Sequence, residues 1–192
     1  YRRGSVDFDL PEALVVLNEE GFIADIVASE RNVAHRIIEE FMLLANETVA
    51  SHLENSGTPA LYRIHESPDP LKVLQFEEFI NPFGYSLGAG ENSVKPKHFQ
   101  KLVEKIKGTA EERPIAFLML RTMQKARYDP NDLGHFGLAA EHYTHFTSPI
   151  RRYPDLVVHR ALRALRHGTL DADARYAMVE ELPEMARHTS EM

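Results

Sequence analysis

The segment His142–Arg160, HYTHFTSPIRRYPDLVVHR, is the part of the sequence from which the rest can be interpreted. It contains three histidines, three arginines, two tyrosines and one phenylalanine, with one acidic residue. A guanidinium can donate to two phosphate oxygens at once, and flat rings between arginines can stack on unpaired bases. The segment is therefore typical of a surface that contacts a nucleic-acid strand.

The same segment predicts a turn followed by a helix. The Ser-Pro pair at positions 148–149 interrupts regular structure. Pro154 is tolerated in a first helical turn, where the carboxylate of Asp155 suits the positive end of the helix dipole. We expect this helix to continue over Leu156–Leu165 and to end at Gly168.

The arginines of this region fall into two groups. Arg151 and Arg152 lie on the turn ahead of the helix N-terminus, where backbone N–H groups and the helix dipole also favour an anion. Arg163 and Arg166 are expected on a solvated helix face. Residues 142–168 contain five arginines and one acid, whereas the whole chain has a net charge of −7. A local basic groove in an acidic protein suits an enzyme that grips one strand.

Upstream, the strongest helix prediction is Arg31–Glu54, with Ser29 or Asn32 as the N-cap. Its apolar stripe consists of Val33, Ile37, Phe41, Leu44 and Thr48. Its opposite face consists of Asn32, His35, Glu39, Asn46 and Ala50. That face is either solvated or, because Leu43 lies within it, directed in part toward a cleft at Glu39.

Short patterned segments predict the remaining elements. Two apolar runs, Ala13–Leu17 and Phe22–Val27, are separated by a turn that contains Gly21, which predicts a β-hairpin. Residues 5–10 alternate between polar and apolar side chains, as a strand does. The other predicted elements are a strand at Leu61–Ile64 and helices at Leu71–Asn81, Pro96–Lys107, Glu111–Arg127 (capped by Thr109) and Leu170–Met192.

Arg63 and His65 lie two residues apart, and therefore on the same side of the predicted strand. They belong either to a loop near a site or to a surface salt bridge. The sequence alone favours the salt bridge.

Composition narrows the class of protein. The chain has 192 residues and no cysteine, which excludes disulfides and thiolate metal sites and favours a reducing, cytoplasmic compartment. No apolar run approaches the roughly 18 residues of a membrane span. His135, His142 and His145 lack the spacing of a metal site, and the acids around Asn131 do not match a calcium loop.

Five segments, taken together in order, resemble a known family. They are RRGSVDFDLPEA, AHRIIEEFMLLAN, ALYRIHESPDP, YDPNDLGHFGLA and YTHFTSPIRRYPDLVVHR, and the resemblance extends from Arg2 to about His188. The chain resembles the C-terminal part of the catalytic (RNB) domain of the ribonuclease II/ribonuclease R family, with a ribonuclease R-like pattern. The resemblance implies an α/β (α+β) fold over residues 1–192, in which a mostly antiparallel sheet is flanked by amphipathic helices.

The resemblance also implies an activity. Members of this family are hydrolytic 3′-to-5′ exoribonucleases that degrade single-stranded RNA to nucleoside monophosphates. In the family, aspartates in a D-x5-D-x-D-D run hold Mg²⁺, which activates water. No such run occurs in this sequence, so we expect the Mg²⁺ ligands and the OB-type RNA-binding domains to lie outside it, and we predict that this chain alone is inactive. Single-stranded RNA is the expected partner, together with RNA-decay proteins.

The residues implied by the resemblance are of two kinds. Arg151 matches an arginine that resembles a phosphate clamp, and Glu39 matches an acidic residue that orients that arginine or the terminal ribose, so both are expected to be catalytic. The expected RNA-binding residues are Asn46, His135, Tyr143, His145, Ser148 and Arg152. For Tyr143, a place in the core is the alternative. For the whole chain, the alternative is a non-catalytic RNA-binding or scaffold protein that lost its metal site.

Overall fold

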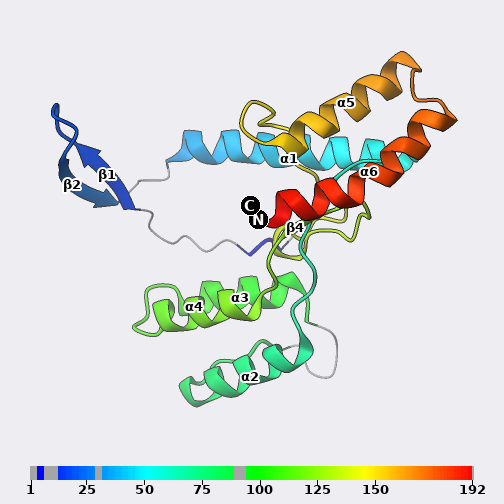
Figure 1. The fold of residues 1–192 in the computed structure, drawn as a ribbon. Coiled ribbons are helices and arrows are strands. Elements are labelled where there is room, and N and C mark those ends of the chain that lie inside the picture. The colour runs from blue at the N-terminus through cyan, green and yellow to red at the C-terminus, as the bar shows by residue number, and fades with distance from the viewer. Residues whose placement is uncertain (1–3, 7–12, 29–31, 89–93, 192) are drawn as a thin grey trace.

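A computed structural model describes residues 4–6, 13–28, 32–88 and 94–191 (Figure 1). In chain order the elements are β1 (Ala13–Leu17), β2 (Ile23–Ala28), α1 (Val33–Asn55), β3 (Tyr62–Ile64), α2 (Pro70–Ile80), the 3-10 turn η1 (Asn81–Phe83), α3 (Pro96–Ile106), α4 (Glu112–Thr122), β4 (Arg127–Asp129), the 3-10 turn η2 (Phe136–Leu138), α5 (Tyr153–His167) and α6 (Ala172–Glu191). Among the described residues, no helix is both long enough and apolar enough to cross a bilayer.

The predicted class, a mixture of helices and antiparallel strands, is confirmed. Strands β1 and β2 form the predicted hairpin, and β3 pairs antiparallel with β4. The sheets are smaller than expected, because each contains two strands within the described residues. Most of the strand predicted over residues 5–10 lies outside the described residues.

The helices form two groups joined at the centre by β3 and β4. In Figure 1, α2, α3 and α4 lie on one side, and α1, α5 and α6 on the other. Each group has its own apolar core: Phe76, Phe99 and Met119 belong to the first, and Leu53, Ile64 and Val158 to the second. The Phe136 ring of η2 packs edge-on against Phe99, with 5.9 Å between ring centroids, and so attaches η2 to the first core.

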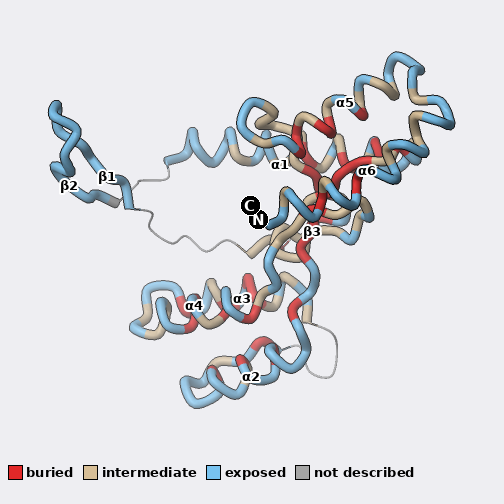
Figure 2. Tube along the Cα trace, in the orientation of Figure 1, coloured by how far each residue is buried: buried red, intermediate tan, exposed pale blue. Residues whose placement is uncertain are grey.

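Helix α1 buries a different face from the one that its sequence predicts. Of the apolar stripe, Val33 is 72% exposed and Phe41 64% exposed. Asn46 and Ala50, on the face expected to be polar, are buried. The reason is position: the C-terminal half of α1 packs on β3 and α5, whereas its N-terminal half extends beyond the core (Figure 2). The interpretation of that face as solvated is wrong at Asn46 and Ala50.

Asn32 caps the start of α1, which confirms one of the two predicted N-caps. Asn32 accepts a hydrogen bond from the N–H of His35, and the His35 ring accepts one from the N–H of Asn32. This reciprocal arrangement satisfies two N–H groups that a helix start leaves without partners. The other predicted cap, Ser29, lies outside the described residues.

Helix α4 is shorter than its sequence predicts. It ends at Thr122, because Arg127–Asp129 leave the helix to pair with β3. The predicted N-cap, Thr109, is also wrong. Its hydroxyl donates to the carbonyl of Ile106 and so closes the end of α3, and Glu111 occupies the N-cap of α4 without a side-chain cap.

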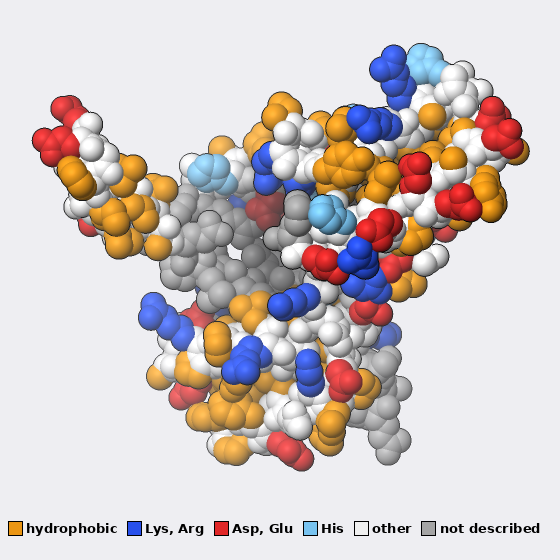
Figure 3. Space-filling model, in the orientation of Figure 1, with side chains coloured by type: hydrophobic (Ala, Val, Ile, Leu, Met, Phe, Trp, Pro, Cys, Tyr) orange, Lys and Arg blue, Asp and Glu red, His pale blue; other side chains and the backbone are white. Residues whose placement is uncertain are grey.

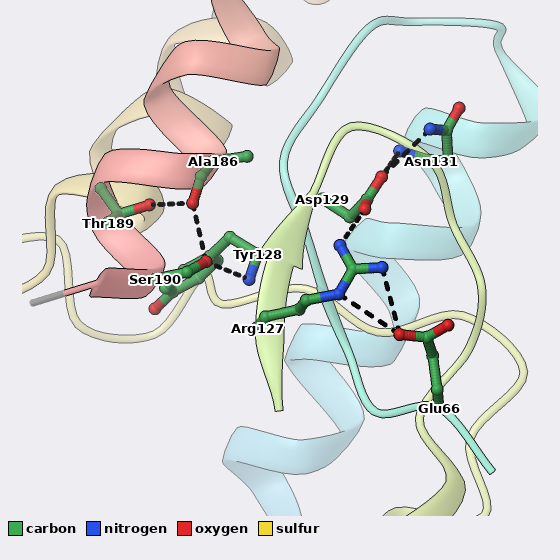
Figure 4. A network of polar contacts seen from close by, with 8 residues as sticks. All are labelled: Glu66, Arg127, Tyr128, Asp129, Asn131, Ala186, Thr189 and Ser190. Carbon is green, nitrogen blue, oxygen red and sulfur yellow. Dashed lines mark hydrogen bonds and ion pairs between the residues drawn. The ribbon is translucent and has the colours of Figure 1, made fainter. Parts of the chain in front are cut away.

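The end of α6 holds β4 in place (Figure 4). The Ser190 hydroxyl accepts the N–H of Tyr128 at 2.9 Å and donates to the carbonyl of Ala186 at 2.7 Å. Next to it, the guanidinium of Arg127 contacts Asp129 and Glu66. Strand β4 therefore has β3 along one edge and α6 along the other, which fixes the segment that follows it.

Candidate nucleic-acid interface

The segment between η2 and α5 is attached to α1 by a buried amide. Asn46 donates its Nδ2–H to the Tyr143 hydroxyl at 3.0 Å, and its Oδ1 accepts the N–H of Phe146 at 3.0 Å. The side chain of Asn46 is almost completely buried, so both bonds satisfy groups that water cannot reach. One α1 residue therefore positions both ends of the stretch 143–146.

A second contact fixes the same stretch from α5. The His159 ring stacks on the Phe146 ring, with centroids 4.1 Å apart and planes within 8°. The Nε2 of His159 also lies 2.9 Å from the carbonyl oxygen of Phe146. Phe146 is thus held between Asn46 and His159, and the segment enters the Ser148–Arg152 turn from a fixed position.

Four aromatic or imidazole rings meet beneath this segment. Tyr143 lies edge-on to His135, at 5.2 Å between centroids, and to His145, at 6.0 Å. The Nδ1 of His145 is 2.7 Å from the Tyr128 hydroxyl. The predicted RNA-binding residues His135, Tyr143 and His145 are therefore direct neighbours, and Asn46 touches the same group.

Burial keeps these histidines neutral. It lowers the pKa of His135 from 6.5 to about 3, with a smaller contribution from the nearby ring of His65. It lowers the pKa of His145 from 6.5 to about 4, with further contributions from Arg152, Arg63 and Arg151. Tyr128 and Tyr143 are nearly buried, so Tyr143 occupies the place in the core that was its alternative, and these rings support the segment from within the fold.

Arg63 and His65 belong to this group, and neither forms the salt bridge that their sequence favours with any residue that the structure describes. Arg63 lies over the Tyr128 ring, 4.7 Å from its centroid. His65 is nearly buried and stacks on His135 at 5.0 Å. Its Nδ1 accepts the N–H of Gly137, and its Nε2 lies 2.8 Å from the carbonyl of Gln124. Their spacing of two residues was the sequence signal that both face one side.

The two adjacent arginines of the turn have different surroundings. Arg152 is paired with Asp155, a carboxylate at the start of α5 with no exposed surface. Arg151 is exposed, and its guanidinium makes no hydrogen bond or ion pair with the described part of the chain. Ser148 lies in the same turn, where its N–H bonds to Asp155.

Glu39 lies on the same face of α1 as Asn46, seven residues earlier, which is about 10 Å along the helix axis. It is half-buried and has interactions within the fold. The predicted residues thus lie in three places. Asn46 contacts the ring group, which consists of Tyr128, His135, Tyr143 and His145. Ser148, Arg151 and Arg152 lie in the turn, and Glu39 lies further along α1. Their roles toward RNA stay predictions.

Asp155 and His159 are structural contributors that the sequence alone did not identify as such. Asp155 is recognisable in the sequence only as an acid in a first helical turn, and His159 only as a ring on a helix. Each acts through a contact that depends on how the turn folds back on α5.

A metal site is not formed by the described residues. Within them, no group of three or more histidine, aspartate or glutamate side chains could hold a metal ion. Mg²⁺ requires several oxygen ligands in octahedral geometry, so the described residues do not fit this ion.

Comparison with known proteins gives the family. The model of the RNB domain matches residues 1–168. Ribonuclease R of Aquifex aeolicus is 52% identical over 182 residues, which is 94% of this chain and 26% of that protein. The chain thus spans about a quarter of the length of this curated relative.

Solved structures agree with this match. Ribonuclease R of Mycoplasma genitalium, in complex with ribose-methylated single-stranded RNA, superposes with a TM-score of 0.89 at 31% identity, covering 99% of this chain and 30% of that one. The same protein in complex with double-stranded RNA gives a TM-score of 0.90, covering 99% of this chain and 34% of that one. Yeast Ssd1, a pseudonuclease, gives a TM-score of 0.68 at 32% identity over 84% of this chain and 20% of that one.

Proposed function

Because this chain belongs to the RNB domain family, we propose that it forms part of a magnesium-dependent, hydrolytic 3′-to-5′ exoribonuclease. Its substrate is single-stranded RNA, and its products are nucleoside monophosphates. The observation that carries the proposal is the family match over residues 1–168, which includes every predicted site residue. A cytoplasmic location and partners in RNA decay belong to the same proposal.

The residues of this chain serve the reaction by binding and orientation. Arg151 donates to the phosphoryl oxygens as their negative charge grows, from a backbone position that the hydrogen bond of its N–H to the carbonyl of Ser148 fixes. Glu39 orients this arginine or the terminal ribose. Asn46 and the rings packed around Tyr143 hold the segment 143–146 that leads to the turn of Arg151. A contact to the 2′-OH distinguishes RNA from DNA.

In our proposal, the ligands of the Mg²⁺ ion are residues other than those that the structure describes. The described residues do not fit it, and the sequence contains no D-x5-D-x-D-D run.

The test uses the intact protein, meaning the full polypeptide that carries this chain. A single-stranded RNA with a label at its 5′ end should shorten progressively from its 3′ end when Mg²⁺ is present. A DNA strand of the same sequence should persist, and so should RNA after the metal is chelated. Release of internal fragments first, or equal loss of the DNA, would contradict the proposal.

The 192-residue chain alone is expected to leave RNA undegraded. The reason is the lack of a metal-binding aspartate run, without which the attacking water is not activated. The measurement is the same labelled-RNA assay, with the intact protein at equal concentration as the positive control. Degradation that depends on Mg²⁺ and persists through further purification would show that this chain holds a complete site.

A second candidate is a non-catalytic RNA-binding or scaffold protein. The similarity to yeast Ssd1, a pseudonuclease, favours it. This candidate requires the intact protein to bind RNA and to leave it undegraded with Mg²⁺ present. The sequence of the intact protein before Tyr1 provides an independent discriminator, because an aspartate cluster there favours the enzyme and its absence favours the scaffold.

A further inference from the structure

Asp155 is a carboxylate with 0% exposed surface at the beginning of α5. A buried charge is costly unless other groups compensate it. Here its Oδ1 accepts the N–H of Ser148 at 2.7 Å and an Nη2–H of Arg152 at 2.9 Å. Its Oδ2 lies 2.8 Å from Nε of Arg152, a charge contact outside hydrogen-bond alignment.

These bonds close a turn around Arg151. While the N–H of Ser148 bonds to Asp155, its carbonyl accepts the N–H groups of Arg151, at 3.2 Å, and of Arg152, at 3.1 Å. Residues on both sides of Arg151 are therefore attached to one buried carboxylate. The backbone of Arg151 is fixed, and its side chain extends outward.

From this arrangement we propose that Asp155 and Arg152 are positioning residues, which hold the Ser148–Arg152 turn so that Arg151 presents its guanidinium to the phosphate. Arg152 acts here within the protein, rather than as the RNA contact that the sequence predicts. The inference rests on the proposed function of Arg151. It also explains how Arg151 is oriented. A lone exposed arginine has no fixed orientation, because ordering its side chain costs conformational entropy.

A capping role for Asp155 that affects α5 alone is the simpler alternative. Such a role would alter stability without a specific effect on turnover. The two roles are separated by measuring the single-turnover rate and the RNA dissociation constant independently, and by asking whether the effect passes through Arg151.

The variants are Asp155→Asn and Arg152→Lys in the intact protein, each alone and combined with Arg151→Ala. Asp155→Asn keeps the shape and the acceptor for Ser148 but removes the charge that holds Arg152. Arg152→Lys keeps the charge and loses the planar fork, and it provides the milder change if Asp155→Asn fails to fold. Arg163→Ala, an exposed arginine of the same helix, is the matched control.

We expect Asp155→Asn to slow the single-turnover rate about 10- to 100-fold, with unchanged RNA affinity, because a misplaced group loses about that much rate. Arg152→Lys should give a smaller loss, and Arg163→Ala none. Amide hydrogen exchange at Ser148, Arg151 and Arg152 should accelerate in both variants. With Arg151 already replaced by alanine, neither change should lower the rate further.

Two results would overturn this inference and leave the proposed function intact. One is that Asp155→Asn or Arg152→Lys lowers the single-turnover rate as much on the Arg151→Ala background as it does alone. The other is weaker RNA binding at unchanged rate in Arg152→Lys, which would make Arg152 a direct RNA contact. If Arg151→Ala by itself leaves the rate unchanged, the proposed role of Arg151 fails, and the inference fails with it for that separate reason.

Discussion

Arg151→Ala in the intact protein is expected to lower the single-turnover rate of RNA degradation about 100- to 1,000-fold, the range found when one donor to a developing oxyanion is removed. RNA affinity should change far less, because the strand keeps its other contacts. The single-turnover rate of Arg151→Lys should lie between those of the unchanged protein and Arg151→Ala, because an ammonium restores the charge without the bidentate geometry.

The structure supports a large effect at Arg151 for two reasons. Its guanidinium is exposed and has no hydrogen-bond or ion-pair partner within the described residues, so it need not break a bond to bind phosphate. Its neighbour Arg152 is already paired with Asp155 and offers no direct substitute. Arg163→Ala is the control. A fall in affinity at constant turnover would reduce Arg151 to a binding group.

Acidification is expected to unfold the 192-residue chain through its buried histidines. The pKa of His135 falls from 6.5 to about 3 on folding, and that of His145 from 6.5 to about 4. Below pH 6.5 the unfolded chain binds protons that the folded chain refuses, so stability falls as the pH falls toward these folded-state values. In this pH window each histidine lowers the free energy of unfolding by about 1.4 kcal/mol for each unit by which the pH falls.

Thermal unfolding followed by circular dichroism, between pH 7.5 and about pH 5, measures this loss. Near pH 7.5 these two histidines should have almost no effect, because they are largely neutral in both states. His135→Phe keeps a ring against Tyr143 and should reduce the pH dependence by about one proton. If the stability of His135→Phe depended on pH as strongly as that of the unchanged chain, His135 would be excluded as a source of the pH dependence.

Local sequence patterns predicted the elements that depend on local interactions. Helices α2, α3, α5 and α6 occur within two residues of their predicted limits. Helix α5 ends at Gly168, which adopts the left-handed conformation with φ of 64°. Periodicity, caps and glycine stops act between residues a few positions apart, so the sequence alone contains this information.

Helix α1 shows where such patterns stop being informative. Its periodicity identified a helix and an apolar stripe, but the surface that covers a stripe belongs to other segments. The structure instead buries Asn46, whose partner Tyr143 is 97 positions away. Likewise, residues 127–129 became a strand because β3 lies beside them, and no pattern within residues 111–127 contains that information.

The candidate site divides in the same way. The sequence by itself determined the family, the Ser-Pro turn and the helix that follows it, and it supplied the prediction that Arg151 binds phosphate. The tertiary structure decided that Arg152 turns inward to Asp155, that Arg63 and His65 join the ring group, and that burial keeps His135 and His145 neutral. The physical reason is that burial, charge pairing and pKa depend on distant residues, which only the folded chain brings together.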